Sequence, residues 1–468
     1  MHAKLAARLA ALSLAPLLAS VLSAPAQAQG PDRAPPPLPA GVTRSYVPLA
    51  NGAPGVLYEP TQPGPKAQIA FYLMHASGDY LTFSACYELS KRGYRVLCAN
   101  NTTSKSGAFD DGVLDDAISQ AAKGVSYLQH LQGVSKVLLF GHSGGATIIT
   151  GYQAIAEGGV AWCQRAELIH RCPDSMAGYK PADGVVLADS NWGQAAMVLL
   201  SIDPAVTDES SGRHLDPSLD SYNPANGFKD GAATYSADFI KRFQAGVAAR
   251  NARLLAHAQE RLALIEAGKG DYTGDELLQI PGAFVAANKL FSTDPRLLNH
   301  SVKPWPLVHK DGSVTTQIIH SVRLASAGPM GPMTSDSYRA SLKTTVKNYL
   351  GSFAIRTTPD FGYGEDSTIR GVDWHSTYAA PPGNVEVFSK PLLTLGMTGN
   401  WEGLAAETIY NHAASKDKSI AFIEGATHVY TPCTACEKTP GQFGDTMKTT
   451  YDYIDKWVSQ PGRFLTGN

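Results

Sequence analysis

Short apolar runs alternate with helical segments over much of this 468-residue chain, and this alternation limits the folds open to it. Residues 68–74 and 136–140 are nearly continuous apolar runs, typical of strands buried on both faces of a sheet. Between them, residues 115–131 carry apolar side chains at helical spacing. Because strands joined by helices run parallel, the sequence predicts a mostly parallel α/β sheet with helices on both faces. The predicted strands are residues 43–49, 55–59, 68–74, 94–99, 136–140, 184–188, 391–396 and 419–423.

The alternation stops between residues 191 and 389. Within this block, residues 239–267 are strongly helical, and residues 305–322 have the pattern of a hairpin. The strand–helix rhythm resumes at residue 391. The sequence therefore predicts one α/β core, residues 43–190 and 390–468, split by a cap or lid insertion at residues 191–389.

The first 28 residues have the features of a secretory signal peptide. Basic residues at positions 4 and 8 precede an apolar run at 9–22, and Ala26-Gln27-Ala28 is a small-x-small cleavage pattern. Residues 29–42 form a Pro-rich lead-in, and no later stretch is long and apolar enough to span a membrane. We therefore expect an exported protein, secreted or periplasmic, without stable membrane insertion.

Charge and cysteine content agree with export. The chain has 39 Lys and Arg against 41 Asp and Glu and no basic run, which argues against a nucleic-acid partner. Its six cysteines form an even set, typical of disulfides in an oxidising compartment. Local pairs are favoured, although spacing alone does not decide the connectivity: Cys163/Cys172, Cys433/Cys436 and, as a third candidate, Cys86/Cys98.

The spacing of Cys433 and Cys436 also fits a redox or zinc motif. A zinc site would need a second cysteine pair at matching spacing, and the sequence has none. A nucleotide-binding glycine motif is likewise absent from the sequence. We therefore expect no metal and no cofactor.

A glycine-rich turn, Gly141-His142-Ser143-Gly144-Gly145, lies between the apolar run at 136–140 and a helical stretch at 146–157. It matches G-x-S-x-G in the strand–turn–helix context that this motif requires. Such a sharp turn presents the hydroxyl of Ser143 at the carboxyl edge of the sheet, where it can act as a nucleophile. The amide of Gly144, at the start of the helix, is placed to stabilise an oxyanion.

On these residues the chain resembles the α/β-hydrolase superfamily. The resemblance covers residues 43–188 and 391–458, with the middle block as the variable cap. It implies an eight-stranded, mostly parallel sheet with the nucleophile after the fifth strand. It also implies an acid after the sixth or seventh strand and a histidine after the eighth.

Carried over to this sequence, the resemblance implies His428 as the general base, because it ends the short loop after the strand at 419–423. Glu402 follows the preceding strand and is the expected acid; Asp189, directly after residue 188, is the alternative. His375, inside the insertion, is a weaker candidate for the base. His142 precedes the serine and should point away from its hydroxyl.

The second oxyanion donor is expected in the loop after the strand at 68–74. Its sequence, His75-Ala76-Ser77-Gly78, resembles the family's His-Gly-x-x with Ala76 in place of Gly. The expected donor is the backbone N–H of Ser77, with Ala76 as the alternative. Four aromatic residues flank the predicted loops and either line an acyl or alcohol pocket or belong to the core: Tyr80, Trp192, Trp401 and Tyr430.

These observations predict an exported serine hydrolase that cleaves a small-molecule or polymeric carboxylic ester through an acyl-enzyme. Amidases or peptidases, lactonases and acyltransferases use the same triad and remain alternatives. A non-catalytic binding protein on a hydrolase scaffold would have lost the nucleophile or the base, and both are present here. The sequence assigns no oligomeric state.

Overall fold

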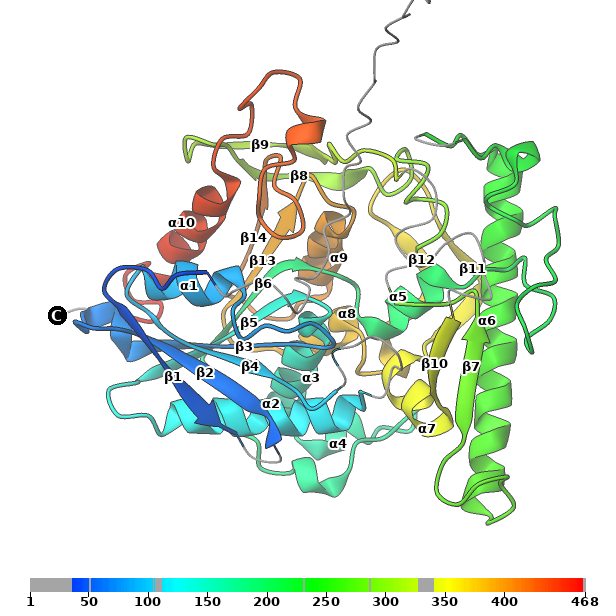
Figure 1. The fold of residues 1–468 in the computed structure, drawn as a ribbon, viewed down its shortest axis with the longest axis horizontal. Coiled ribbons are helices and arrows are strands. Elements are labelled where there is room, and N and C mark those ends of the chain that lie inside the picture. Colours follow the sequence, from blue (N-terminus) through cyan, green and yellow to red (C-terminus); the bar gives the residue numbers. More distant parts are fainter. Residues whose placement is uncertain are drawn as a thin grey trace, which may run out of the picture.

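The computed structural model describes residues 36–49, 52–103, 105, 112–229, 232–285, 288–326 and 341–465. Its centre is a ten-stranded sheet in the order β1-β2-β4-β3-β5-β6-β13-β14-β8-β9 (Figure 1). The strands are β1 (Val42–Pro48), β2 (Pro54–Pro60), β3 (Ile69–His75), β4 (Arg95–Asn100), β5 (Lys136–Ser143), β6 (Gly184–Ser190), β8 (His300–Val308), β9 (Val314–His320), β13 (Leu392–Met397) and β14 (Lys418–Ile423). The predicted signal peptide, residues 1–28, lies outside the described residues.

The strands from β4 to β8 in this order run parallel, and antiparallel pairs occur only at the two ends of the sheet. The continuous apolar runs explain the parallel centre, because both faces of these strands are covered. In β6 every residue is buried, and in β3 every residue but the last. The predicted α/β fold class is therefore confirmed.

The sheet has ten strands rather than the eight implied by the resemblance. The two additional strands, β8 and β9, form a hairpin within residues 191–389, the predicted cap. β8 pairs in parallel with β14, with Leu307 opposite Phe422, so this part of the insertion extends the core sheet. The pairing covers a strand edge that would otherwise be open, and it buries Leu307 and Val308.

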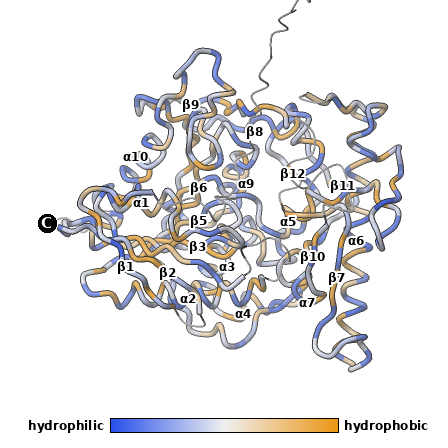
Figure 2. The backbone as a smooth tube through the Cα atoms, in the orientation of Figure 1, coloured by the Kyte–Doolittle hydropathy of each residue, from blue (hydrophilic) through white to orange (hydrophobic). Residues whose placement is uncertain are grey.

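Alternate residues of the central strands enter two separate hydrophobic cores. Tyr72 and Met74 of β3 point to the face covered by α2, α3 and α9, whereas Phe71 and Leu73 point to the face covered by α1 and α10. Figure 2 shows hydrophobic segments along the central strands. The helices around the sheet are α1 (Ser84–Ser90), α2 (Leu114–Gln129), α3 (Gly145–Gly158), α4 (Val160–Cys163), α9 (Ala405–His412) and α10 (Thr446–Val458).

The rest of the insertion forms two small antiparallel pairs, β7 with β10 and β11 with β12, and α6 packs against β11. In Figure 1 these elements gather beyond α5 and α8, to one side of the central sheet. Their bounds are α5 (Gln194–Ser201), α6 (Ala237–Glu266), β7 (Leu277–Pro281), β10 (Ser341–Thr345), α7 (Val346–Asn348), β11 (Arg356–Tyr363), β12 (Ile369–Asp373) and α8 (Pro381–Asn384). Among the described residues, none of the helices combines the length and hydropathy that a membrane span needs.

All six cysteines form disulfides between the predicted local partners, Cys86–Cys98, Cys163–Cys172 and Cys433–Cys436. Cys86 lies in α1 and Cys98 in β4, so the first disulfide ties a helix to the sheet. Cys433 and Cys436 are only three positions apart. A cross-link that closes a longer loop removes more entropy from the unfolded chain.

We expect replacement of Cys86 and Cys98 together by Ala to lower the free energy of unfolding by about 2–3 kcal/mol, because the cross-linked residues are 12 positions apart. Urea denaturation without reductant measures this loss. The matched control replaces Cys433 and Cys436 by Ala and should cost less. Equal losses in the two variants, or free thiols in the unreduced unfolded protein, would contradict this expectation.

Candidate active site

The turn between β5 and α3 depends on close backbone packing. Ser143, the last residue of β5, has φ 51°, an uncommon conformation for a residue other than Gly. A Cβ on Gly145 would lie 2.5 Å from the carbonyl oxygen of Met74 in β3, so α3 can pass this strand only with glycine there. The serine is thereby held, partly exposed, at the carboxyl edge of the sheet.

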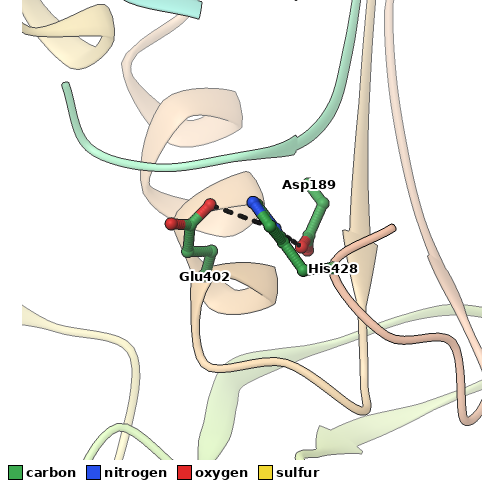
Figure 3. Close-up of side chains that lie close together, drawn as sticks. All are labelled: Asp189, Glu402 and His428. Carbon is green, nitrogen blue, oxygen red and sulfur yellow. Dashed lines mark hydrogen bonds and ion pairs between the residues drawn. The ribbon is translucent and has the colours of Figure 1, made fainter. Parts of the chain in front are cut away.

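Three polar side chains from different parts of the sequence meet at this edge. Asp189 lies near the end of β6, Glu402 follows β13, and His428 follows β14 (Figure 3). The His428 ring centre is 4.4 Å from that of His142, the residue before Ser143, so the imidazole stands beside the turn. Among the described residues, the hydrogen bonds of His428 go to other groups and none goes to the Ser143 hydroxyl.

Asp189 makes the shorter contact with the imidazole. Its Oδ2 lies 2.7 Å from His428 Nδ1, and the side chain is fully buried. The carboxylate also accepts hydrogen bonds from Asn400 Nδ2 at 2.7 Å and from the Met397 N–H at 3.0 Å. The structure thus places Asp189, the alternative acid of the sequence prediction, nearer to His428 than Glu402.

Glu402, the acid that the sequence prediction favoured, lies on the same side of the imidazole but farther away. Its Oε2 is 3.4 Å from His428 Nδ1 and has no hydrogen-bond donor among the described residues. Burial, together with the charge of Asp189, raises the pKa of Glu402 to about 7, although His428 and the polar groups of Asn191 and Ser143 act in the opposite direction.

Both carboxyl groups affect the pKa of His428, the candidate base. Burial alone would lower the pKa of His428, but the charge of Glu402 and the hydrogen bond and charge of Asp189 raise it to about 9. Asp189, Glu402 and His428 offer ligand atoms within 4.8 Å of one another, a spacing that could also hold a metal ion. Because Asp189 Oδ2 and His428 Nδ1 already hydrogen-bond to each other, we interpret the group as an oriented base.

His142 holds the backbone of the histidine loop. Its Nε2 lies 2.7 Å from the His428 carbonyl oxygen and must therefore donate, which leaves Nδ1 to accept from the Tyr80 hydroxyl at 2.5 Å. Burial lowers the pKa of His142 well below its ordinary value, so the ring is neutral, as this pattern requires. The sequence analysis predicted only that this side chain avoids the serine hydroxyl.

The predicted second oxyanion donor is already engaged. The Ser77 N–H donates to His75 Nδ1 at 3.1 Å, and the Gly78 N–H donates to the same nitrogen at 2.7 Å. Burial lowers the pKa of His75 to about 3, which keeps this nitrogen an acceptor. Ala76 packs beside the turn, since its Cβ lies 3.5 Å from the place of a Cβ on Gly144. The local geometry therefore favours the alternative donor, Ala76.

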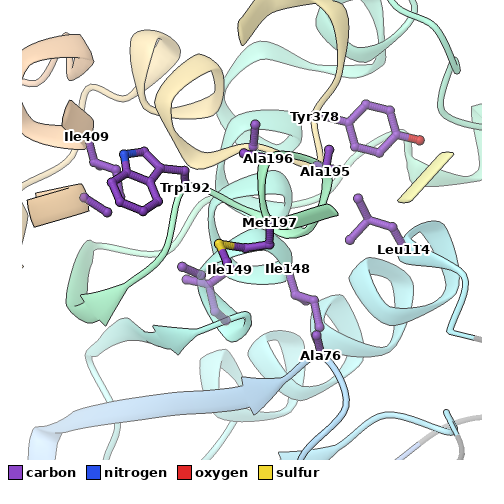
Figure 4. Packing of buried hydrophobic residues seen from close by; sticks show 14 of the residues in the cluster. Ala76, Leu114, Ile148, Ile149, Trp192, Ala195, Ala196, Met197, Tyr378 and Ile409 are labelled. Carbon is purple, nitrogen blue, oxygen red and sulfur yellow. The ribbon is translucent and has the colours of Figure 1, made fainter. Parts of the chain in front are cut away.

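The four flanking aromatic residues divide between site and core. Tyr80 and Tyr430 pack against the His142 ring, beside the base. Trp192 is fully buried, donates to Thr408 Oγ1 and belongs to the packed core beside α3 (Figure 4). Trp401 contacts the Phe291 ring of the insertion. A cavity of about 560 Å³ lies elsewhere, between α6 and β11, and contains none of the predicted site residues.

Two positioning residues were not assigned from the sequence. Asn400 donates to Asp189, and His142 anchors the loop of His428. Asn400 lies in the same short loop as Glu402, so its place in this loop is the sequence feature that could have indicated its role. His375, the weaker candidate base, pairs with Glu386 at 2.6 Å and takes no part in this cluster.

We expect Gly145→Ala to lower the free energy of unfolding by about 1–3 kcal/mol, because the added methyl group meets the Met74 carbonyl. Helix propensity alone would favour Ala by about 1 kcal/mol, so a loss identifies the steric conflict. Gly64→Ala is the matched control, with φ −95° and no atom within 4 Å of its added Cβ. Urea denaturation of both variants provides the measurement, and a Gly145 variant as stable as the control would contradict the packing argument.

No family model matches the chain, and no curated protein matches it by sequence. Solved structures resemble it at low identity. A hypothetical protein from Pseudomonas aeruginosa is 13% identical with a TM-score of 0.41, covering 91% of this chain and 99% of that one. Carboxyl esterase 2 of the mycorrhizal fungus Tuber melanosporum is 11% identical with a TM-score of 0.37, covering 89% and 88%. An esterase of the bacterial hormone-sensitive lipase family is 12% identical with a TM-score of 0.39, covering 90% and 86%.

Similarities this distant carry no argument about activity. The fold is therefore identified from the strand order and the site residues of this chain. The strand order places β5 at the centre of a parallel sheet, with a serine at positive φ between this strand and α3. Polar residues follow at the ends of β6, β13 and β14. These features together are those of the α/β-hydrolase fold.

Proposed function

We propose that this protein is a serine hydrolase that cleaves a carboxylic ester through an acyl-enzyme, with Ser143 as nucleophile, His428 as base and Asp189 as the orienting acid. The observation that carries the proposal is the 2.7 Å contact between Asp189 and His428 beside the turn of Ser143. A base oriented by a carboxylate next to a serine at positive φ is the arrangement that acyl transfer needs.

In the proposed first step, Ser143 Oγ attacks the ester carbonyl carbon while His428 Nε2 accepts the hydroxyl proton. The imidazolium that forms is stabilised by Asp189 through its Nδ1–H. The negative charge on the former carbonyl oxygen is held by the N–H groups of Gly144 and Ala76. The tetrahedral intermediate expels the alcohol, which takes the proton from His428, and leaves an acyl-enzyme.

In the second step, water attacks the acyl-enzyme while His428 Nε2 accepts one of its protons. Collapse of this intermediate releases the carboxylic acid and returns the proton to Ser143. Asp189 serves as the orienting acid because it is nearer than Glu402 and its other donors hold it in place. His142 and Asn400 act as positioning residues, because His142 donates to the His428 carbonyl oxygen and Asn400 donates to Asp189.

Esters are the proposed substrate class, as small molecules or in polymers, because an alcohol is a better leaving group than an amine at the same triad. We further propose that the protein acts outside the cytoplasm, secreted or periplasmic. Three disulfides support this placement, because disulfides persist in oxidising compartments. The predicted cleavage pattern after Ala28 supports it independently.

Hydrolysis of p-nitrophenyl esters from acetate to palmitate tests the proposal. We expect Ser143→Ala to abolish turnover and Asp189→Asn to lower kcat by about 10⁴-fold, because the imidazole loses its orienting charge. The chain length that gives the highest kcat/KM would bound the acyl pocket. Circular dichroism and urea denaturation check that each variant is folded, and a folded Ser143→Ala variant with wild-type activity would contradict the mechanism.

A further inference from the structure

The site holds one more buried carboxyl group than a serine hydrolase triad needs. Asp189 Oδ2 lies 2.7 Å and Glu402 Oε2 lies 3.4 Å from the same atom, His428 Nδ1. A protonated Nδ1 has one hydrogen to donate, and the nearer oxygen takes it. Glu402 is therefore available for a role other than accepting that hydrogen.

The two carboxyl groups have very different surroundings. Asp189 accepts from the imidazole, from Asn400 and from the Met397 N–H. Glu402 is only 3% exposed, and its Oε2 has no donor among the described residues. Asn191 and Ser143 hydrogen-bond to the side chain, but they leave Oε2 without a donor. A buried carboxylate with an unsatisfied oxygen is costly, whereas a protonated carboxyl group carries no charge. The surroundings of Glu402 therefore favour its protonated form.

Four other titratable side chains, which surround this pair, do not change their protonation state near neutral pH. Desolvation lowers the pKa of His75, at the end of β3, to about 3 and that of His142, in β5, well below its ordinary value. Tyr80, before α1, and Tyr430, after β14, are buried, which raises the pKa of each well above its ordinary value. The positive charge of Lys105 acts on His75. The changes of charge near neutral pH therefore fall on the glutamate and the base.

We propose that Glu402 is a proton-carrying member of the site whose own ionisation sets the proton affinity of His428. As a neutral carboxylic acid, it leaves the imidazole free to accept the proton of Ser143. As a carboxylate, it adds a second negative charge near Nδ1 and holds the imidazole in its protonated form, which cannot act as a base. This role rests on the function proposed above, because it concerns the same base.

The sign of the coupling gives the pH dependence. Burial raises the pKa of Glu402 to about 7, and the two carboxyl groups outweigh burial and raise the pKa of His428 to about 9. Because these groups interact, their protons leave in two steps that belong to the pair. Removing the charge of Glu402 removes one of the two charges that stabilise the imidazolium. The pKa of His428 then falls, and the base is active at lower pH.

Glu402→Gln tests the proposal, because it keeps the size of the side chain and removes its charge. We expect the acid limb of the kcat/KM profile for a p-nitrophenyl ester to move down by at least one pH unit. Activity well below the limb should then rise about tenfold or more. Glu424→Gln is the matched control: Glu424 lies four positions before His428 but pairs with His309 at 2.7 Å, and its loss should leave the limb unchanged.

A second readout does not depend on turnover. NMR titration of the His428 ring in the wild-type protein should show two steps, and Glu402→Gln should show a single step at lower pH. If this titration behaves as expected while no ester is cleaved, the coupling stands and the ester-hydrolase proposal fails. The wild-type titration needs no substitution, so a variant that does not fold leaves it intact.

A single-step titration of His428 in the wild-type protein, or an unchanged midpoint in folded Glu402→Gln, would overturn the coupling. So would a folded Glu402→Gln variant that loses activity at every pH while Asp189→Asn stays active. In that case Glu402 would be the orienting acid.

Discussion

The close packing of the turn at Ser143 against β3 is the constraint on which the site depends. α3 starts where the Gly145 backbone passes the Met74 carbonyl, with no room for a side chain. This contact fixes both the serine and the loop after β3, which carries the proposed oxyanion donor Ala76. Apolar strands buried on both faces keep the sheet beneath it rigid, because two hydrophobic cores cover it. The chemistry at the edge is therefore built on a framework that leaves its loops little freedom.

Charge burial is the second constraint. Two buried carboxyl groups lie beside one imidazole, and a charge without a partner at this place would be costly. Asp189 meets this cost with three hydrogen bonds, one from His428, one from the end of β13 and one from the loop after β13. Glu402 leaves its Oε2 without a donor, and the charge of His428 acts on its pKa. The proposed function and the proposed pH response thus rest on the same asymmetry between two acids.

Much of the fold could be predicted from the sequence, because the parallel sheet and the turn of Ser143 are encoded locally. Continuous apolar runs identify strands covered on both faces, and the glycines around the serine mark the sharp turn. The resemblance also brought His428, Asp189 and Glu402 to one edge. The pairing of the β8–β9 hairpin with the core sheet could not be predicted, since the residues of the hairpin do not specify which strand it pairs with. Strand pairing is a tertiary property.

For a similar reason, the sequence could not predict which of the two acids lies nearer to His428. Asp189 lies at the end of one buried strand and Glu402 after another, and the distances to His428 and the hydrogen bonds of Asn400 and Met397 distinguish them. The hydrogen bond from the Ser77 N–H to His75, which bears on the proposal of Ala76 as the donor, is likewise not visible in the sequence. Details of this size arise from packing between segments far apart in the sequence.

The central claim is that Ser143 is an activated nucleophile, and covalent labelling tests it most directly. The folded protein would be treated with a fluorophosphonate, and the labelled residue would be located by peptide mass spectrometry. The account predicts one adduct per chain, on Ser143, and none in the Ser143→Ala variant. No adduct on the folded wild-type protein, or an adduct on a different residue, would contradict it.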